Sequence, residues 1–175
     1  KHNVKYLVTQ PHIPNASISS GFDIELTSGQ YDWLIAELSV NDGYDIVVIQ
    51  HEPLSGTYTK TSDSTSYTWS MPTVDIADVL RARKSRSAGT FTDSRGTLHA
   101  YDFTNCTSNL LCVFHGHLHD EMYMTKATIG LPIYVADWFG NAYTCCYGLI
   151  DRANGKLKIW KFNNSTVANV LELDL

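Results

Sequence analysis

Two short apolar runs place the strongest constraint on the fold of this chain. Ile46-Val47-Val48-Ile49 is continuously apolar and β-branched, and Leu110-Leu111-Cys112-Val113-Phe114 is a second run of the same kind. Strands that are apolar on both faces are typical of sheets covered on both sides, as in α/β proteins. Each run leads into histidines, and the carboxyl ends of such strands line the ligand crevice of open α/β sheets. We therefore predict an α/β fold with a histidine-lined site at His51, His117 and His119.

The composition fits one globular domain spanning residues 1–175. Of these residues, 43% are apolar, which is enough to build a sizeable core. The formal charge is −5, and the basic residues are scattered except between Arg81 and Arg86, which argues against a nucleic-acid-binding surface. No apolar run approaches the roughly 20 residues of a membrane span, and the polar start does not resemble a signal peptide. The four cysteines show no C-x-x-C spacing, so we expect reduced thiols and a cytoplasmic location.

The remaining pattern predicts the elements around the two apolar runs. Thr27 and Gln30 have the spacing of a capping box, and Tyr31, Leu34, Ile35 and Leu38 then form the apolar stripe of a helix. Residues 55–71, rich in Ser, Thr and Tyr, predict a long surface loop. The other predicted elements are a strand at Val4–Thr9, a helix from Thr73 that ends in the basic cluster 81–86, a hairpin over 90–99 and a β meander with strands at 132–136, 146–150 and 156–160.

The histidines suggest a metal site. Imidazoles gathered at one sheet edge are good nitrogen ligands for a divalent ion. Gly116 should let the backbone turn sharply enough to aim His117 and His119 at one point. From its place before Gly116, we interpret His115 as a residue that either supports the ligands from behind or is exposed. His2, His12 and His99 are interpreted as ordinary hydrogen-bonded histidines.

At these residues the chain resembles the calcineurin-like metallophosphoesterases. Gly116-His117-Leu118-His119 matches that family's G-H-x-H motif, and the segment 47–54 matches its strand ending in H-x-P at His51-Glu52-Pro53. The helix around 30–34 is similar to the family's Q-x-x-W-L helix. The resemblance implies that His51 and His117 bind the second metal of a dinuclear site and that His119 binds the first. His115 and Asp120 are candidates for residues that support these ligands.

Three motifs of that family, D-x-H, G-D-x-x-D and G-N-H-[DE], should precede the 30–34 helix and are not in the sequence. The resemblance therefore implies the C-terminal part of an α/β/β/α sandwich of mixed sheets flanked by helices, with the N-terminal part missing or supplied separately. It also implies two divalent ions, Mn, Fe or Zn, and a phosphoester substrate. No catalytic residue is assigned within the chain, and we expect the isolated chain to be inactive.

Two other interpretations were compared with this one. The segment 115–120 superficially resembles the H-x-H-x-D-H motif of metallo-β-lactamase-fold hydrolases, but its last residues are in the wrong order and no histidine follows His119. The remaining alternative is a non-catalytic scaffold or interaction domain of the same fold with a partial or structural metal site. Tyr58, Tyr67 and Trp69 could stack on a substrate base or sugar, although local packing is the simpler role.

Overall fold

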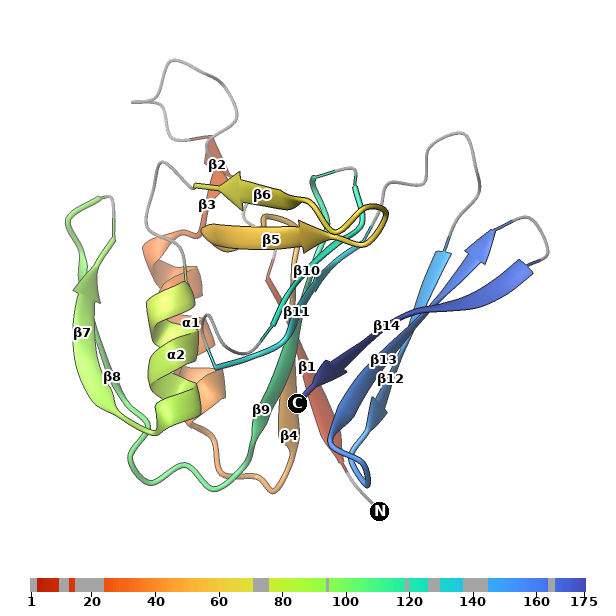
Figure 1. Ribbon diagram of the computed structural model, residues 1–175. Helices are drawn as coiled ribbons and strands as arrows, with labels where there is room; N and C mark the ends of the chain where they lie inside the picture. Colours follow the sequence, from red (N-terminus) through yellow and green to blue (C-terminus); the bar gives the residue numbers. More distant parts are fainter. Residues whose placement is uncertain are drawn as a thin grey trace.

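The computed structural model of the protein describes residues 3–9, 13–14, 24–70, 76–93, 95–118, 120–125, 130–136, 145–163 and 166–175. It is a strand-rich mixed α/β structure with a seven-stranded sheet and two helices in its described part. The helices cover one face of this sheet and a three-stranded sheet covers the other (Figure 1). Neither described helix is long and apolar enough to cross a membrane.

The large sheet has the strand order β1-β4-β9-β11-β10-β5-β6. The strands β1, β4, β9 and β11 run parallel to one another, whereas β10, β5 and β6 pair antiparallel. The central strands β4 and β9 are the two apolar runs, and nearly every side chain on them is buried. The bounds are β1 Val4–Thr9, β4 Asp45–Gln50, β9 Leu110–His115, β11 Ile133–Val135, β10 Met122–Met124, β5 Gly56–Lys60 and β6 Ser66–Trp69.

Two helices pack on one face of this sheet. α1 spans Ser28–Ser39, and its predicted capping box is present because Thr27 and Gln30 exchange side-chain hydrogen bonds with each other's backbone N–H. Its buried residues are the predicted stripe Tyr31, Leu34, Ile35 and Leu38. α2 spans Ala77–Ser85, within the predicted helix, and buries Val79 and Leu80 together with Arg83. The predicted cap at Thr73 lies outside the described residues.

The opposite face of the sheet packs on the strands β12 Cys145–Asp151, β13 Lys156–Asn163 and β14 Thr166–Asp174. Leu157, Ile159 and Leu173 from these strands form a second core with Val47 and Cys112 of the large sheet. The predicted meander is therefore correct for β12 and β13. β11 instead joins the large sheet through β9, and β14 was not predicted.

The prediction of a surface loop over residues 55–71 is wrong, because β5 and β6 form a hairpin there. Thr and Tyr favour strands, but a polar segment forms a stable strand only when it pairs with another strand. Here β5 pairs with β10. Tyr58 is fully buried and donates to the Leu54 carbonyl oxygen (2.7 Å), while Tyr67 and Trp69 pack against the main core. These aromatic side chains therefore pack locally.

Two smaller ribbons complete the described fold. β7 Ala88–Thr92 and β8 Leu98–Asp102 form the predicted hairpin, with Phe91 opposite His99. β2 Ile13–Pro14 and β3 Ile24–Glu25 form a short pair that was not predicted. Cys106 and Cys112 are buried thiols, and they and Cys146 form no disulfide within the described residues.

Candidate metal centre

The carboxyl ends of β4 and β9 hold the candidate site. These strands are parallel neighbours, and the last residue of β4, Gln50, lies opposite the last residue of β9, His115. The chain segments that follow therefore leave the sheet side by side. The backbone N–H of Gly116 donates to the carbonyl oxygen of His51 (3.0 Å), which ties the two segments together. This register brings His51 next to His117, as the sequence predicted.

His51, His117 and Glu52 form one compact donor cluster. Nε2 of His51 lies 3.3 Å from Nδ1 of His117, which in turn lies 3.1 Å from Oε1 of Glu52. The three potential ligand atoms all lie within 4.8 Å of one another. Neither histidine points into the apolar core: His51 is exposed and His117 is partly exposed. The cluster thus opens at the sheet edge while its carboxylate is buried.

The spacing of these atoms fits a metal ion. Two ligand atoms about 2.0–2.1 Å from a tetrahedral ion lie roughly 3.3–3.4 Å apart. Two of the three separations, 3.3 Å and 3.1 Å, are close to that edge length, and the third, between His51 and Glu52, is longer but within 4.8 Å. Two imidazoles and a carboxylate also form a recognised ligand set for zinc. The residues present therefore fit one divalent ion.

Glu52 is the functional candidate that sequence reasoning missed. Its side chain is 1% exposed, and burial raises its carboxyl pKa to about 7. Oε1 makes no hydrogen bond of normal geometry within the described part of the chain. Gln50 fixes the backbone here, because its Nε2 donates to the Glu52 carbonyl oxygen (2.6 Å). The only sequence signal for Glu52 as a ligand was its position directly after His51. The sequence does not show in which direction the chain turns there, and that direction decides whether the carboxylate faces the histidines.

The sharp backbone turn that we expected at Gly116 lies at His117 instead. His117 itself adopts the left-handed conformation, with φ of 69°, whereas Gly116 has no positive φ. A β-carbon at position 116 would lie 3.3 Å from Nδ1 of His51. Gly116 is thus needed for close approach rather than for the turn. Backbone strain of the kind seen at His117 is concentrated at functional sites.

The other predicted site residues have different outcomes. His115 is buried, so an exposed role is wrong. Burial lowers its pKa to about 3, and neither ring nitrogen makes a normal hydrogen bond within the described structure. Asp120 forms an ion pair with Lys60 (2.6 Å). His119, His2 and His12 lie outside the described residues. His99 is a buried histidine bonded to two carboxylates, as an ordinary structural role predicts.

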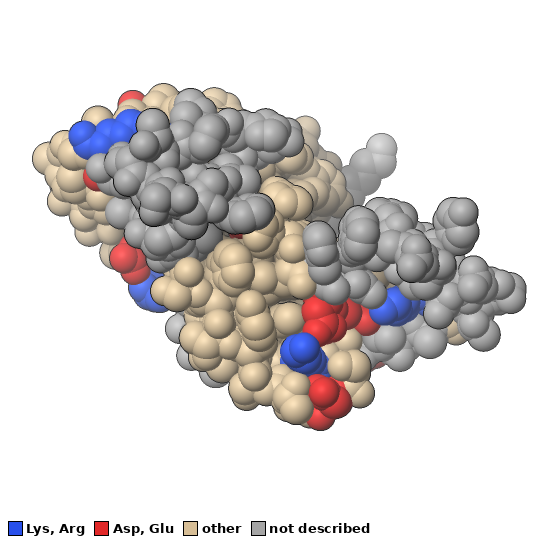
Figure 2. Space-filling model, turned by 90° about the horizontal axis from the view of Figure 1, so that it is seen from above, with Lys and Arg blue, Asp and Glu red and all other residues tan. Residues whose placement is uncertain are grey.

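A cleft of about 370 Å³ adjoins His51 and Gly116, and Val8, Ile49 and Phe114 contribute apolar surface to its wall. The ring of Trp69 packs edge-on against that of His117, with the two centroids 5.3 Å apart. Figure 2 views the molecule from above, where acidic and basic side chains lie interspersed on the described part of the visible surface. This face carries no continuous basic patch among the residues drawn in colour.

Comparison of the chain with family models, curated proteins and solved structures finds no match.

Proposed function

We propose that the protein is a metal-dependent phosphoester hydrolase and that this chain supplies part of its metal site. One observation carries the proposal: Nε2 of His51 and Nδ1 of His117 converge to 3.3 Å at the carboxyl ends of two parallel strands. The order of layers, helices on a large sheet on a smaller sheet, supports the C-terminal part of an α/β/β/α sandwich.

Within this proposal, His51, His117 and Glu52 hold one divalent ion, and His119 contributes to a second. Manganese, iron or zinc suits such mixed nitrogen and oxygen ligands. The ions supply a polarised phosphoryl oxygen and an activated water. The chain's own residues bind and orient: Gln50 fixes the backbone of Glu52, and Trp69 limits the position of the His117 ring. The carboxylate of Glu52 adds the anionic ligand that the missing upstream motifs would otherwise provide.

The first test is metal binding by titration calorimetry. Zn²⁺ and Mn²⁺ should bind the purified chain at pH 7.5, and affinity should fall below about pH 6, because the ligand imidazoles must be neutral. His117→Ala and Glu52→Gln should each weaken binding at least tenfold. Glu172→Gln is the matched control, since this carboxylate is exposed on β14. Unchanged affinity in both site variants, with normal circular dichroism, would exclude this metal centre.

The second test is hydrolysis of aryl phosphomonoesters and diesters with manganese. We expect the chain alone to act only slightly above background, because two ions need ligands that the matched positions lack. A version extended upstream to include D-x-H, G-D-x-x-D and G-N-H-[DE] motifs should turn over, and His117→Ala should abolish that activity. Metal binding without hydrolysis in the extended version would favour the scaffold alternative. Robust turnover by the short chain, lost in His117→Ala, would mean that its own groups activate the nucleophile.

A further inference from the structure

A second polar cluster lies at the amino end of β9, opposite to the strand end that holds the candidate metal centre. Three cationic side chains from the end of α2 reach the segment 107–110, where each donates to a backbone carbonyl oxygen. Nη2 of Arg83 bonds to Ser108 (3.0 Å), Nζ of Lys84 to Leu110 (3.2 Å) and Nη2 of Arg86 to Thr107 (3.3 Å). Leu110 begins β9 and His115 ends it, so this cluster is separated from the metal centre by the length of that strand.

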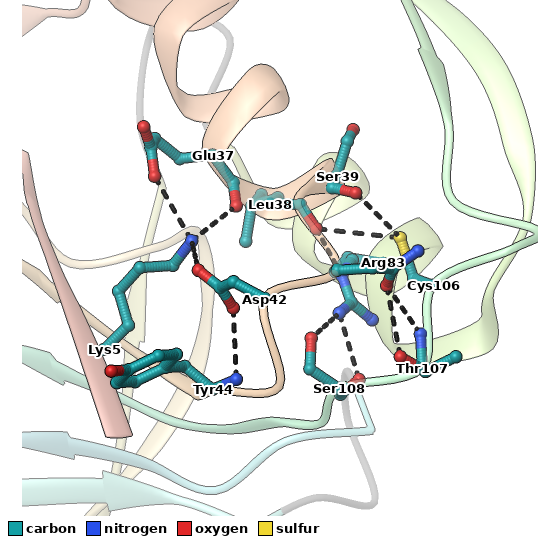
Figure 3. Close-up of polar contacts among 11 residues, drawn as sticks. Lys5, Glu37, Leu38, Ser39, Asp42, Tyr44, Arg83, Cys106, Thr107 and Ser108 are labelled. Atoms are coloured by element: carbon teal, nitrogen blue, oxygen red, sulfur yellow. Dashed lines mark hydrogen bonds and ion pairs between the residues drawn. The ribbon is translucent and has the colours of Figure 1, made fainter. Parts of the chain in front are cut away.

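Arg83 is the unusual member of the cluster. Its side chain is 1% exposed, and Figure 3 shows its guanidinium between the last turn of α1 and Ser108. Nε donates to the Leu38 carbonyl oxygen (2.7 Å), and Nη2 also donates to Oγ of Ser108 (2.8 Å). All of these acceptors are neutral, and no carboxylate within the described residues forms an ion pair with Arg83. Buried charges are normally paired with an opposite charge.

The local charges do not balance. Arg83 and Arg86 together carry two positive charges. Burial lowers the pKa of Arg83, and Arg86 lowers it further, while Cys106 and Asp45 act in the opposite direction. The C-terminal ends of α1 and α2 each offset roughly half a charge. The nearby carboxylate of Asp45 is already paired with Arg152 (2.5 Å). About one positive charge of Arg83 and Arg86 is left, in a chain whose net charge is −5.

These groups surround a pocket of about 130 Å³. Its lining residues are Arg83, Lys84, Arg86, Ser108, Asn109 and Leu110, and none of them is acidic. A small pocket with excess positive charge and a neighbouring hydroxyl suits a compact, strongly accepting anion. We propose that this pocket is a binding site for a tetrahedral oxyanion, namely phosphate either free or as the terminal group of a phosphomonoester.

The test uses the full chain with EDTA, so that the metal centre does not contribute. Inorganic phosphate and O-phosphoserine are titrated at constant ionic strength, with chloride as the balancing anion. Binding is followed by thermal unfolding and by two-dimensional ¹H–¹⁵N NMR. Arg86→Gln and Lys84→Gln are the test variants. Arg81→Gln is the matched control, because Arg81 lies on the same helix but is exposed, pairs with Asp78 and does not line the pocket.

Phosphate should raise the melting temperature of the wild type above that in chloride and should shift the amides of residues 83–87 and 107–110. Arg86→Gln should weaken binding at least fivefold, whereas Arg81→Gln and His117→Ala should bind like the wild type. Binding of O-phosphoserine as well identifies a terminal phosphate group, and binding of phosphate alone identifies the free anion. The site is refuted if neither compound binds, if Arg86→Gln and Lys84→Gln both bind normally, or if the shifted amides surround His51 and His117. The wild-type shifts decide the question even where a variant fails to fold.

Discussion

His117 combines a position in the candidate metal centre with an unfavourable backbone conformation. Its φ of 69° lies in the left-handed region, which costs a residue with a β-carbon roughly 1–2 kcal/mol relative to the right-handed one. The backbone N–H of Leu118 donates to the carbonyl oxygen of Gly116 (2.9 Å), and this bond holds the turn in which the strain is kept. The imidazole is thereby directed at His51 and Glu52 rather than along the strand.

This strain predicts that two variants which both remove the imidazole will differ in stability. His117→Gly should have a free energy of unfolding about 1 kcal/mol higher than His117→Ala, because glycine adopts positive φ without steric cost. Urea denaturation of the metal-free proteins measures this difference, and both variants should show the same loss of metal affinity. Equal stability of the two variants would mean that position 117 is not strained.

Gly116 provides a second residue-scale prediction. Gly116→Ala should weaken metal binding roughly threefold to tenfold, because the new β-carbon would crowd Nδ1 of His51 at 3.3 Å and displace its ring. The control is Gly29→Ala on α1, because a β-carbon at position 29 would meet no atom within 4 Å. Gly96→Ala is unsuitable, because the positive φ of Gly96 would itself be strained by a β-carbon. Calorimetric titration of both variants with Zn²⁺ tests the difference. An undisturbed affinity in Gly116→Ala would show that the close approach is dispensable.

His99 joins α1 to the β7–β8 hairpin. Its Nδ1 lies 2.7 Å from Oδ1 of Asp32, and its Nε2 lies 3.2 Å from Oδ2 of Asp93. Burial favours the neutral imidazole, but the two carboxylates outweigh this effect and raise the pKa of His99. Asp93 is also buried, yet bonds from Ser28, from Thr97 N–H and from His99 hold its pKa at about 2.

These shifts predict opposite pH dependences for the two groups. Folding raises the pKa of His99, so the protonated imidazole adds to the free energy of unfolding. This contribution is complete below the unfolded-state pKa of about 6.5 and is lost as the pH rises through the folded-state pKa. Asp93 contributes about 2 kcal/mol above pH 4, which is lost as pH falls toward 2. Urea unfolding of the wild type and His99→Gln between pH 5.5 and 9 measures the first effect. The difference in stability between the two proteins should shrink as pH rises, and a constant difference would contradict the assignment.

At the scale of elements, α1 depends on its first turn more than on intrinsic propensity. The helix has no acidic residue in its first turn and no basic residue in its last, so the capping box is its main terminal stabilisation. Its C-terminal carbonyl oxygens are instead satisfied from outside: Lys5 donates to Glu37 (3.1 Å) and Arg83 to Leu38 (2.7 Å). Figure 3 shows both contacts at this end of the helix.

Loss of the cap should therefore be measurable. Thr27→Ala should lower the free energy of unfolding by about 1 kcal/mol, because the N–H of Gln30 loses the side-chain oxygen of Thr27 and keeps only its carbonyl oxygen as acceptor, whereas Thr27→Ser should be nearly neutral. Chemical denaturation of the two variants provides the comparison. Equal destabilisation by Ala and Ser would indicate that the threonine methyl, not its hydroxyl, stabilises the helix start.

At the scale of the molecule, the two cores share the large sheet. Val47 and Val48 are consecutive on β4, and they point into the core with β12–β14 and into the core with the helices, respectively. Glu121 adds a polar link, since Thr61 next to β5 and Lys161 of β13 both donate to its Oε2 (3.1 and 3.2 Å). The three-stranded sheet and the helices thus depend on the same central strands.

This arrangement predicts cooperative unfolding of a single domain. Ile159→Ala should destabilise the protein by about 2–5 kcal/mol, because the side chain is fully buried between the two sheets. Fluorescence and circular dichroism should still report one coincident urea transition for this variant. Two separate transitions would show that β12–β14 form an independent unit.

The sequence by itself determined the elements whose signals are local. The apolar runs of β4 and β9, the capping box of α1 and the paired strands of the β7–β8 hairpin each depend on neighbouring residues, and all are present as predicted. The proximity of His51 and His117 was also predictable. Each follows the carboxyl end of an apolar strand, and the carboxyl ends of neighbouring parallel strands lie on the same side of the sheet.

Only the tertiary structure decided the features that depend on distant partners. The hairpin over 56–69 exists because β10 pairs with β5, and no pattern within that segment shows a partner more than 50 residues away. Glu52 joins the candidate metal centre, and Arg83 enters the interior, because of the direction in which each side chain leaves its turn or helix. From a sequence, a charged residue is predicted to be exposed. Whether it is buried depends on how the elements pack together, which the local sequence pattern does not encode.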